Sequence, residues 1–301
     1  MTIQWFPGHM NKAKLAIKEL VADIDIVIEL LDARAPFSSC NPLIQNIIQY
    51  KKKIRLLNKS DLSDAGITRL WLEYFQKQDN TTAITADMND TKQRNRIIRL
   101  CRELAPNRNS FEKPLRVMIT GIPNVGKSTL INQLIGKKSA KTGDIPAVTK
   151  ANQCLTLADD FLIYDTPGMT WQKIHYAQVG YHLALCNSIG RNALDEEICA
   201  LYLINYLKLH YPQLCCNRYK LKSTDLALED DQILELIGKK RGCIIPGGII
   251  DYQRTGTIII QDFREGKIGQ ISLETPDMWE KWIKESIQEE QQQLNSELAT
   301  E

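Results

Sequence analysis

Residues 121–128 read Gly-Ile-Pro-Asn-Val-Gly-Lys-Ser, and this stretch fills every fixed position of the pattern G-x-x-x-x-G-K-[ST]. It follows an apolar run, 115–120, that is typical of a buried strand, and it opens a segment, 127–134, with helical periodicity. Glycines let backbone N–H groups curl around phosphate oxygens, and the helix N-terminus adds positive potential. Lys127 can reach the β- and γ-phosphates, and Ser128 can ligate Mg²⁺. We predict a phosphate site lined by Asn124, Val125, Gly126, Lys127, Ser128 and Thr129.

A second phosphate-side motif, Asp165-Thr-Pro-Gly168, follows the strand candidate 161–164. An aspartate at a strand end can hold Mg²⁺, directly or through water, and the N–H of Gly168 can face the γ-phosphate. Thr149 lies between the two motifs, and its hydroxyl can close onto Mg²⁺ when the γ-phosphate is present, although other threonines lie nearby. We expect Ser128, Thr149 and Asp165 to hold Mg²⁺. We also expect Lys127, Thr149 and Gly168 to serve the reaction at the γ-phosphate.

A separate base-reading motif, Asn58-Lys59-Ser60-Asp61, ends the strand candidate 53–57. A carboxylate such as that of Asp61 accepts two hydrogen bonds from guanine, whereas adenine lacks this donor pair and would leave the carboxylate unpaired. The stem of Lys59 can cover the ring and Asn58 can brace the loop. Thr85 and Ala86, at the end of the next strand candidate, can offer a backbone N–H to the guanine carbonyl. The sequence therefore predicts binding of GTP and GDP.

The order of these motifs along the chain is reversed with respect to ordinary GTPases, in which the phosphate loop comes first. Here the base motif at 58–61 precedes the phosphate loop at 121–128. A sheet determines where strand ends meet, whatever the order of their connections. We therefore predict a circularly permuted P-loop GTPase domain in which the same site forms.

Alternation of short apolar runs with helical segments predicts an open, mostly parallel sheet with helices on both faces. This α/β domain is expected to span residues 1–173, and its last two strands, 153–157 and 161–164, are expected to pair as a hairpin. Beyond it, 174–301 is predicted to be a mainly α-helical domain. Its helices are expected at 177–186, 194–209, 224–241, 251–263 and 276–294.

Composition places the chain among ordinary globular proteins, with 301 residues, 43% hydrophobic residues and 25% charged residues. A net charge of +2 is too small to indicate nucleic-acid binding by itself. The N-terminus shows no secretory or transit signal, and no apolar run reaches the roughly 20 residues that cross a bilayer. We expect a cytoplasmic monomer without a membrane partner. The eight cysteines are expected to be mostly buried free thiols, and His182 with Cys186 a packing pair.

Several stretches carry a resemblance that covers nearly the whole chain. They are WFPGHM at 5–10, DARAP at 32–36, Asn41–Pro42, the phosphate loop, DTPG at 165–168, KRGC at 240–243, DYQR at 251–254 and GKIG at 266–269. Together with the permuted order, they resemble the bacterial ribosome biogenesis GTPase A (YlqF/RbgA) family. The resemblance implies a permuted GTPase domain, an RNA-contacting helical domain, and a role in late assembly of the large ribosomal subunit. It also implies precursor particles, with their rRNA and ribosomal proteins, as partners.

Two positions depart from the family pattern. The family usually has Gly-Val-Thr at the switch threonine, where this chain has Ala147-Val148-Thr149. The chain also has Asp87 where the family motif has a lysine after Thr85-Ala86. The backbone contact to guanine survives the second change, and the threonine hydroxyl survives the first.

The sequence does not single out one group that orients or activates the attacking water. Many GTPases orient the attacking water with a glutamine directly after D-x-x-G, and Met169 occupies that position here. His9, within the N-terminal stretch of the family, is one candidate for orienting or deprotonating water. Asn124 is the second, because similar GTPases with Asn at this position resemble K⁺-dependent enzymes. We expect slow intrinsic hydrolysis that pre-ribosomal particles accelerate.

Basic clusters at 51–55, 92–102, 137–141 and 239–241 suit contacts with an RNA backbone, and they equally suit solvated faces of a near-neutral protein. One alternative function is a nucleotide switch that binds a protein effector without an RNA role. A second, an ATP-using metabolic enzyme, requires Asp61 to be irrelevant.

Overall fold

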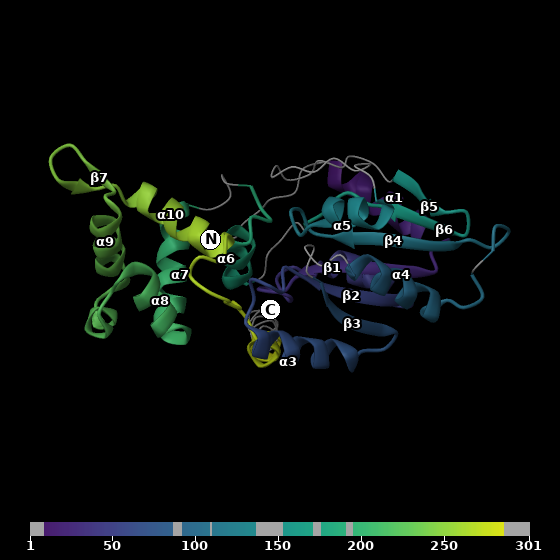
Figure 1. The fold of residues 1–301 in the computed structure, drawn as a ribbon, viewed down its shortest axis with the longest axis horizontal. Coiled ribbons are helices and arrows are strands. Elements are labelled where there is room, and N and C mark those ends of the chain that lie inside the picture. Colours follow the sequence, from purple (N-terminus) through teal and green to yellow (C-terminus); the bar gives the residue numbers. More distant parts are fainter. Residues whose placement is uncertain are drawn as a thin grey trace, which may run out of the picture.

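The computed structural model describes residues 9–86, 92–108, 110–136, 153–170, 176–190 and 195–285, with the backbone alone for 9–14. A sheet occupies one end of the molecule and a group of helices the other (Figure 1). The sheet has the order β3-β2-β1-β4-β6-β5, in which every neighbouring pair is parallel except β5 and β6. Its strands are β1 Ile26–Asp32, β2 Lys52–Asn58, β3 Thr81–Ala86, β4 Leu115–Gly121, β5 Gln153–Ala158 and β6 Phe161–Asp165. The predicted hairpin is therefore confirmed.

Both faces of the sheet are covered, as its continuous apolar strands require. Successive side chains of a strand point to opposite faces. Ile26, Ile28 and Leu30 of β1 accordingly pack under α4 (Gln93–Leu104) and α5 (Lys127–Ile135). Val27 and Leu31 face the other way, toward the side of α1 (His9–Val21), α2 (Pro42–Ile48) and α3 (Ala65–Gln76).

The carboxyl ends of the parallel strands all meet at one edge of the sheet. Asp32 pairs in register with Asn58, and Asn58 pairs with Ala86. Gly121 lies beside Leu30 on the other side of β1, and Asp165 beside Ile119 of β4. The ends that carry the predicted base and phosphate motifs are thus neighbours, which is the arrangement that the permuted order requires.

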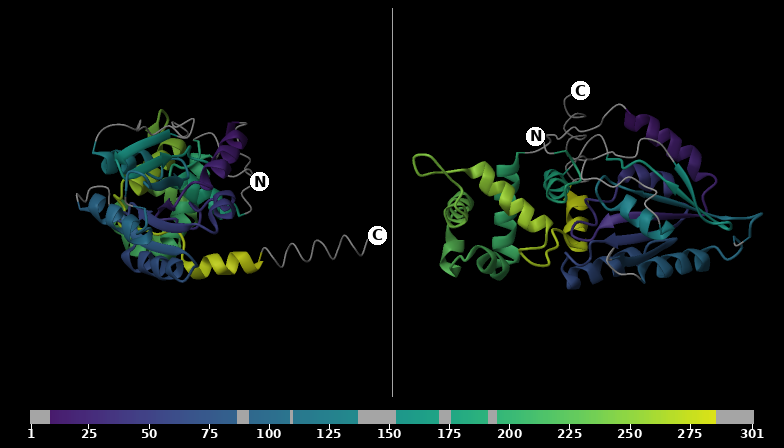
Figure 2. Two further views of the ribbon diagram at one scale, coloured as in Figure 1. Left: turned by 90° about the vertical axis from the view of Figure 1, so that its right-hand side faces the viewer. Right: turned by 45° about the horizontal axis from the view of Figure 1, so that its top comes forward.

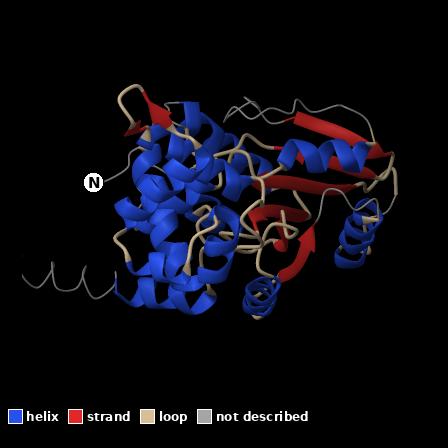
Figure 3. Ribbon diagram, turned by 60° about the vertical axis from the view of Figure 1, so that its left-hand side comes forward, coloured by secondary structure: helices blue, strands red, loops and turns tan. Residues whose placement is uncertain are grey.

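The second part of the chain is mainly helical (Figure 3). Its elements are α6 Ala177–Leu185, α7 Glu196–His210, α8 Pro212–Tyr219, the 3-10 helix η2 Ser223–Ala227, α9 Asp230–Arg241, β7 Ile244–Ile245, β8 Ile249–Ile250 and α10 Tyr252–Arg264. Their apolar faces form a core of their own. Helical structure also covers 276–285, against α3 of the sheet part, as the views in Figure 2 show.

The prediction of one continuous helix over 224–241 is wrong. Leu228 and Glu229 are extended, with ψ near 163° and 155°, and they separate η2 from α9. Glu229 instead caps α9, because its backbone N–H donates to the side chain of Gln232. The sequence reading also missed α8 and the short β7–β8 hairpin. The predicted domain boundary at 173/174 stays a prediction. Helix α6, which follows this boundary, contributes residues to both hydrophobic cores.

Candidate nucleotide-binding site

The phosphate loop has the backbone of an anion cradle. Asn124 and Gly126 adopt left-handed φ values of 57° and 105°, so the loop curls before α5 begins at Lys127. The Lys127 side chain is buried inside this curl, where Nζ donates to the carbonyl oxygens of Gly121 at 3.1 Å and Ile122 at 3.0 Å. The loop therefore presents α5's N-terminus and an ammonium group to the same point.

Burial lowers the pKa of Lys127 to about 8, and the nearby carboxylate of Asp165 opposes this shift. A bound phosphate would add negative charge beside Lys127 and, like the carboxylate of Asp165, would stabilise its charged form against burial. Gly168 closes the site from the D-x-x-G side. A Cβ atom at Gly168 would lie 2.8 Å from Lys127 Nζ and 3.1 Å from the backbone of Pro123, so this close approach requires glycine.

The base motif lies directly against the phosphate loop. Asn58 Nδ2 donates to the carbonyl oxygen of Val125 at 2.8 Å, and Lys59 Nζ donates to that of Asn124 at 3.2 Å. Ser60 Oγ donates to the carbonyl oxygen of Ala86 at 3.1 Å, which joins the loop to the end of β3. The tertiary structure thus brings together the two motifs that the chain carries in reversed order.

Asp32, Arg34 and Lys59 form a buried ion cluster beside the base motif, which the sequence did not predict. Asp32, at the end of β1, binds the Arg34 guanidinium through both oxygens at 2.9 and 2.8 Å, and Lys59 Nζ at 3.0 Å. Burial alone would raise the pKa of Asp32, but the charges of Arg34 and Lys59 hold it far below its usual range. Asp32 therefore orients Lys59, the residue predicted to cover the guanine ring. The DARAP stretch was the available signal.

The remaining predicted site residues divide into two groups. Ser128 is half-buried, Thr129 is exposed, and Asp165 is buried at the end of β6, on the same edge as the loop. Thr149, Ala147 and Asp87 lie outside the described residues, as does the side chain of His9. The predictions that concern them stay predictions.

Met169 is buried, 3% exposed, in the cluster with Met118 and Ile44 beneath α1 and α2. Its carbonyl oxygen accepts a hydrogen bond of 2.8 Å from Asn41 Nδ2. The residue after D-x-x-G is therefore a packing group whose side chain belongs to the core.

Known proteins are similar to this chain. A family model described as RsgA GTPase matches residues 9–175, and one described as 50S ribosome-binding GTPase matches 116–240. Ribosome biogenesis GTPase A of Priestia megaterium is 41% identical over 284 residues, which cover 92% of this chain and 98% of that protein. The chain belongs to the ribosome biogenesis GTPase A family.

More distant members of the family agree. Ribosome biogenesis GTPase A of Thermotoga maritima is 30% identical over 277 residues, covering 91% of this chain and 95% of that protein. The crystal structure of GNP-bound YlqF from T. maritima matches with a TM-score of 0.64 at 27% identity, covering 88% of this chain and 98% of that one. The predicted fold class and the family resemblance are confirmed, and the chain is a GTPase.

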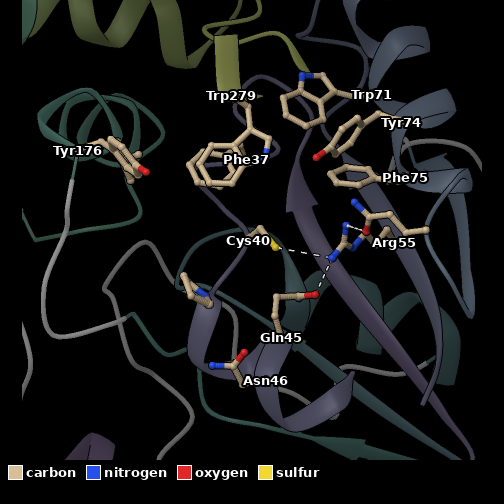
Figure 4. A pocket seen from close by; sticks show the side chains of 13 residues that line it. Phe37, Cys40, Gln45, Asn46, Arg55, Trp71, Tyr74, Phe75, Tyr176 and Trp279 are labelled. Carbon is tan, nitrogen blue, oxygen red and sulfur yellow. Dashed lines mark hydrogen bonds between the residues drawn. The ribbon is translucent and has the colours of Figure 1, made fainter. Parts of the chain in front are cut away.

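A hollow of the GTPase is lined by aromatic side chains. It has a volume of about 320 Å³, and its wall includes the rings of Phe37, Trp71, Tyr74, Phe75, Tyr176 and Trp279 (Figure 4). Its polar wall is satisfied internally, because Arg55 donates to Glu29 at 3.1 Å, to Gln45 at 2.5 Å and to Gln78 at 2.6 Å. The residues that line it belong to none of the nucleotide motifs.

Several basic residues proposed for RNA contact are engaged within the GTPase. Arg55 is buried with Glu29, Arg102 pairs with Asp160, and Arg241 pairs with Asp262. The cluster 51–55 is therefore largely part of the fold, whereas 137–141 lies outside the described residues.

His182 is a buried hydrogen-bonding residue. Its Nδ1 lies 3.0 Å from Glu274 Oε2, and its Nε2 lies 2.8 Å from the hydroxyl of Tyr202. Within the part of the chain that the structure describes, no group of three or more metal-binding side chains occurs. No described helix is long and apolar enough to cross a membrane. Of the eight free thiols, Cys154 is exposed, Cys40 is half-buried and the other six are buried.

Proposed function

We propose that this GTPase hydrolyses GTP to GDP and phosphate during late assembly of the large ribosomal subunit, and that the immature particle stimulates the reaction. The observation that carries the proposal is the contrast within the site. Base motif and phosphate loop are packed together and ready to bind, whereas Met169, at the position that often orients water, is buried in the core. Relatives that carry the name ribosome biogenesis GTPase A support the assembly role.

The residues present fit a nucleotide with its magnesium ion. The cradle around Lys127 is shaped by glycines, and among the described residues Oδ1 of Asn58 is buried without a hydrogen-bond partner. Ser128, Asp165 and Thr149 would hold Mg²⁺, which neutralises charge on the phosphate oxygens. Lys127 would bind the β- and γ-phosphates, the N–H of Gly168 would face the γ-phosphate, and Asp61 would accept hydrogen bonds from guanine.

The missing catalytic contribution is proposed to come from His9, from K⁺ held near Asn124, or from the particle itself. Asn124 supports the second source by its position, since it stands at the curl of the phosphate loop. A monovalent cation there would stabilise developing charge on the phosphates. We further propose that residues 174–301 contact the rRNA or proteins of the particle, and that the protein acts in the cytoplasm as a monomer.

The test is GTP turnover with and without immature large subunits, measured in K⁺ and in Na⁺. We expect slow turnover of the isolated protein and acceleration by the particle, and the K⁺ proposal predicts that Na⁺ lowers the rate. Lys127→Ala is the inactive control. Fast turnover that ignores the particle would refute the proposal. GTP-dependent co-sedimentation with the particle separates it from a switch that binds a protein effector.

Salt dependence tests the RNA contact. Each phosphate that a basic side chain neutralises steepens the loss of binding with salt. Particle binding should therefore fall steeply as the salt concentration rises, and salt-independent binding would argue for a contact with protein alone.

A further inference from the structure

Residues 266–274, which we name the return segment, leave α10 and run back along the base-reading loop. The N–H of Ile271 donates to the carbonyl oxygen of Leu62 at 3.0 Å. Ser272 Oγ accepts from the N–H of Asp64 at 3.2 Å, and Gln270 Nε2 donates to the carbonyl oxygen of Asp61 at 3.1 Å. Three consecutive residues of the return segment therefore hold the loop at Asp61, the predicted guanine reader, and just beyond it.

The return segment is itself anchored in the helical part. The hydroxyl of Tyr206, on α7, donates to the carbonyl oxygen of Ser272 at 2.9 Å, and the hydroxyl of Tyr211 accepts from the N–H of Ser272 at 3.2 Å. Ser272 has no exposed surface. Its position is therefore set by α7 and the start of α8, and the base-reading loop is held against that fixed point.

The far end of the return segment reaches the turn that follows β1. The N–H of Leu273 donates to the carbonyl oxygen of Arg34 at 2.7 Å, and the Arg34 guanidinium lies 4.9 Å from the ring centre of Phe263 on α10. The carboxylate of Glu274 accepts from the N–H of Ser38 at 2.9 Å. One segment of the helical part thus contacts both loops that border the base site.

We infer that the return segment positions Asp61, so that the guanine affinity of the site depends on helical-part residues that belong to no nucleotide motif. The inference rests on the proposed base site. A carboxylate that accepts two hydrogen bonds from guanine must be held in one orientation, because hydrogen bonds weaken steeply when misaligned. Asp61 is exposed and stands in a turn, so the orientation of its side chain depends on how the turn is held. The return segment makes three hydrogen bonds with this turn and the residues that follow it, at Asp61, Leu62 and Asp64. Gln270 and Ser272 are therefore positioning residues.

A matched pair of glycines offers the test. Gly266, at the start of the return segment, has φ +70°, and a Cβ atom there would lie 2.7 Å from Leu62 Cδ2 in the base-reading loop. Gly242 ends α9 with φ +68°, and a Cβ atom there meets nothing within 4 Å. Gly266→Leu and Gly242→Leu both place a leucine in a left-handed backbone conformation of the helical part, but only the first must displace the side chain of Leu62, next to Asp61.

Affinities for GDP, GTP and ITP should be measured on the isolated full-length protein by fluorescence or calorimetry. ITP lacks the 2-amino group, so it loses less when Asp61 is misplaced. We expect Gly266→Leu to weaken GDP and GTP about tenfold and ITP distinctly less, while Gly242→Leu binds all three like the unaltered protein. Stability measured in parallel should fall for both, which a merely structural role would also produce. The loss of preference for GTP over ITP is specific to positioning.

A milder pair keeps the inference testable if either leucine variant fails to fold. Gln270→Ala removes the exposed hydrogen bond to Asp61, and Gln261→Ala removes an exposed hydrogen bond to Glu265 on α10. We expect Gln270→Ala to weaken GDP about threefold, and Gln261→Ala to leave it unchanged. Equal affinities and equal base preference within both pairs would overturn the inference. An unaltered protein that bound no guanine nucleotide would instead contradict the proposed function.

Discussion

Replacing Asp32 by asparagine tests how much the buried ion cluster beside the base site contributes to the free energy of unfolding. The side chains of Asp32 and Arg34 are 1% and 2% exposed, and they are joined by two hydrogen bonds. Asp32→Asn keeps the shape but leaves the Arg34 guanidinium buried without its counter-charge. Removing one partner of such a pair costs about 3–5 kcal/mol of the free energy of unfolding.

A second aspartate–arginine pair serves as the matched control. Asp160 and Arg102 make the same two-bonded contact, at 2.6 and 3.1 Å, but their side chains are 23% and 41% exposed. Water screens such a pair, and its loss costs about 0–1 kcal/mol. Asp160→Asn should therefore be nearly neutral. The double change Asp32→Asn with Arg34→Met removes both buried charges and should recover part of the stability that Asp32→Asn loses.

The assay is urea unfolding followed by tryptophan fluorescence at several pH values. The folded-state pKa of Asp32 lies far below its ordinary value of 3.8. Its contribution is therefore fully present above pH 3.8 and is lost as the pH falls toward the folded-state pKa. The difference between the unaltered protein and Asp32→Asn should be constant near neutrality and shrink in acid. Equal losses for Asp32→Asn and Asp160→Asn would refute the reasoning.

Three further predictions follow from the same geometry. The pKa of Lys127 is lowered to about 8, and phosphate binds the charged form of this side chain. GDP affinity measured between pH 7 and 9 should therefore be constant below pH 8 and fall above it by up to about tenfold per pH unit. Lys127→Arg should show no such change in slope over the same range. Asn58→Ala removes the hydrogen bond to Val125 and should weaken GDP about two- to tenfold in calorimetry; unchanged affinity would mean that the two loops hold their positions independently. Cys154 is the one exposed thiol among the eight, so a thiol reagent should label one group rapidly. Cys154→Ser should abolish this rapid phase, and several rapidly labelled thiols would contradict the described burial.

Much of the fold could be read from the sequence, because the apolar runs at 26–32 and 115–121 and the helical segments between them carry periodicities that local backbone geometry imposes. The errors have local causes as well. The break at Leu228 and Glu229 lies inside a stretch whose composition suits a helix, and the deciding contact is the cap formed by Gln232. The basic run 51–55 looks like a surface patch in the sequence, but β2 turns Arg55 inward against Glu29.

The sequence by itself predicted the chemistry of the site, because phosphate and guanine recognition require particular residue types at short fixed spacings, as at 58–61 and 121–128. It also determined the permuted order. Only the tertiary structure decided which distant groups complete that site. Asp61 is held by Gln270, 209 positions away, and Lys59 is oriented by a carboxylate at the end of another strand. Such contacts depend on the meeting of strand ends and on a segment that returns from another part of the molecule, and no local pattern in the chain encodes either.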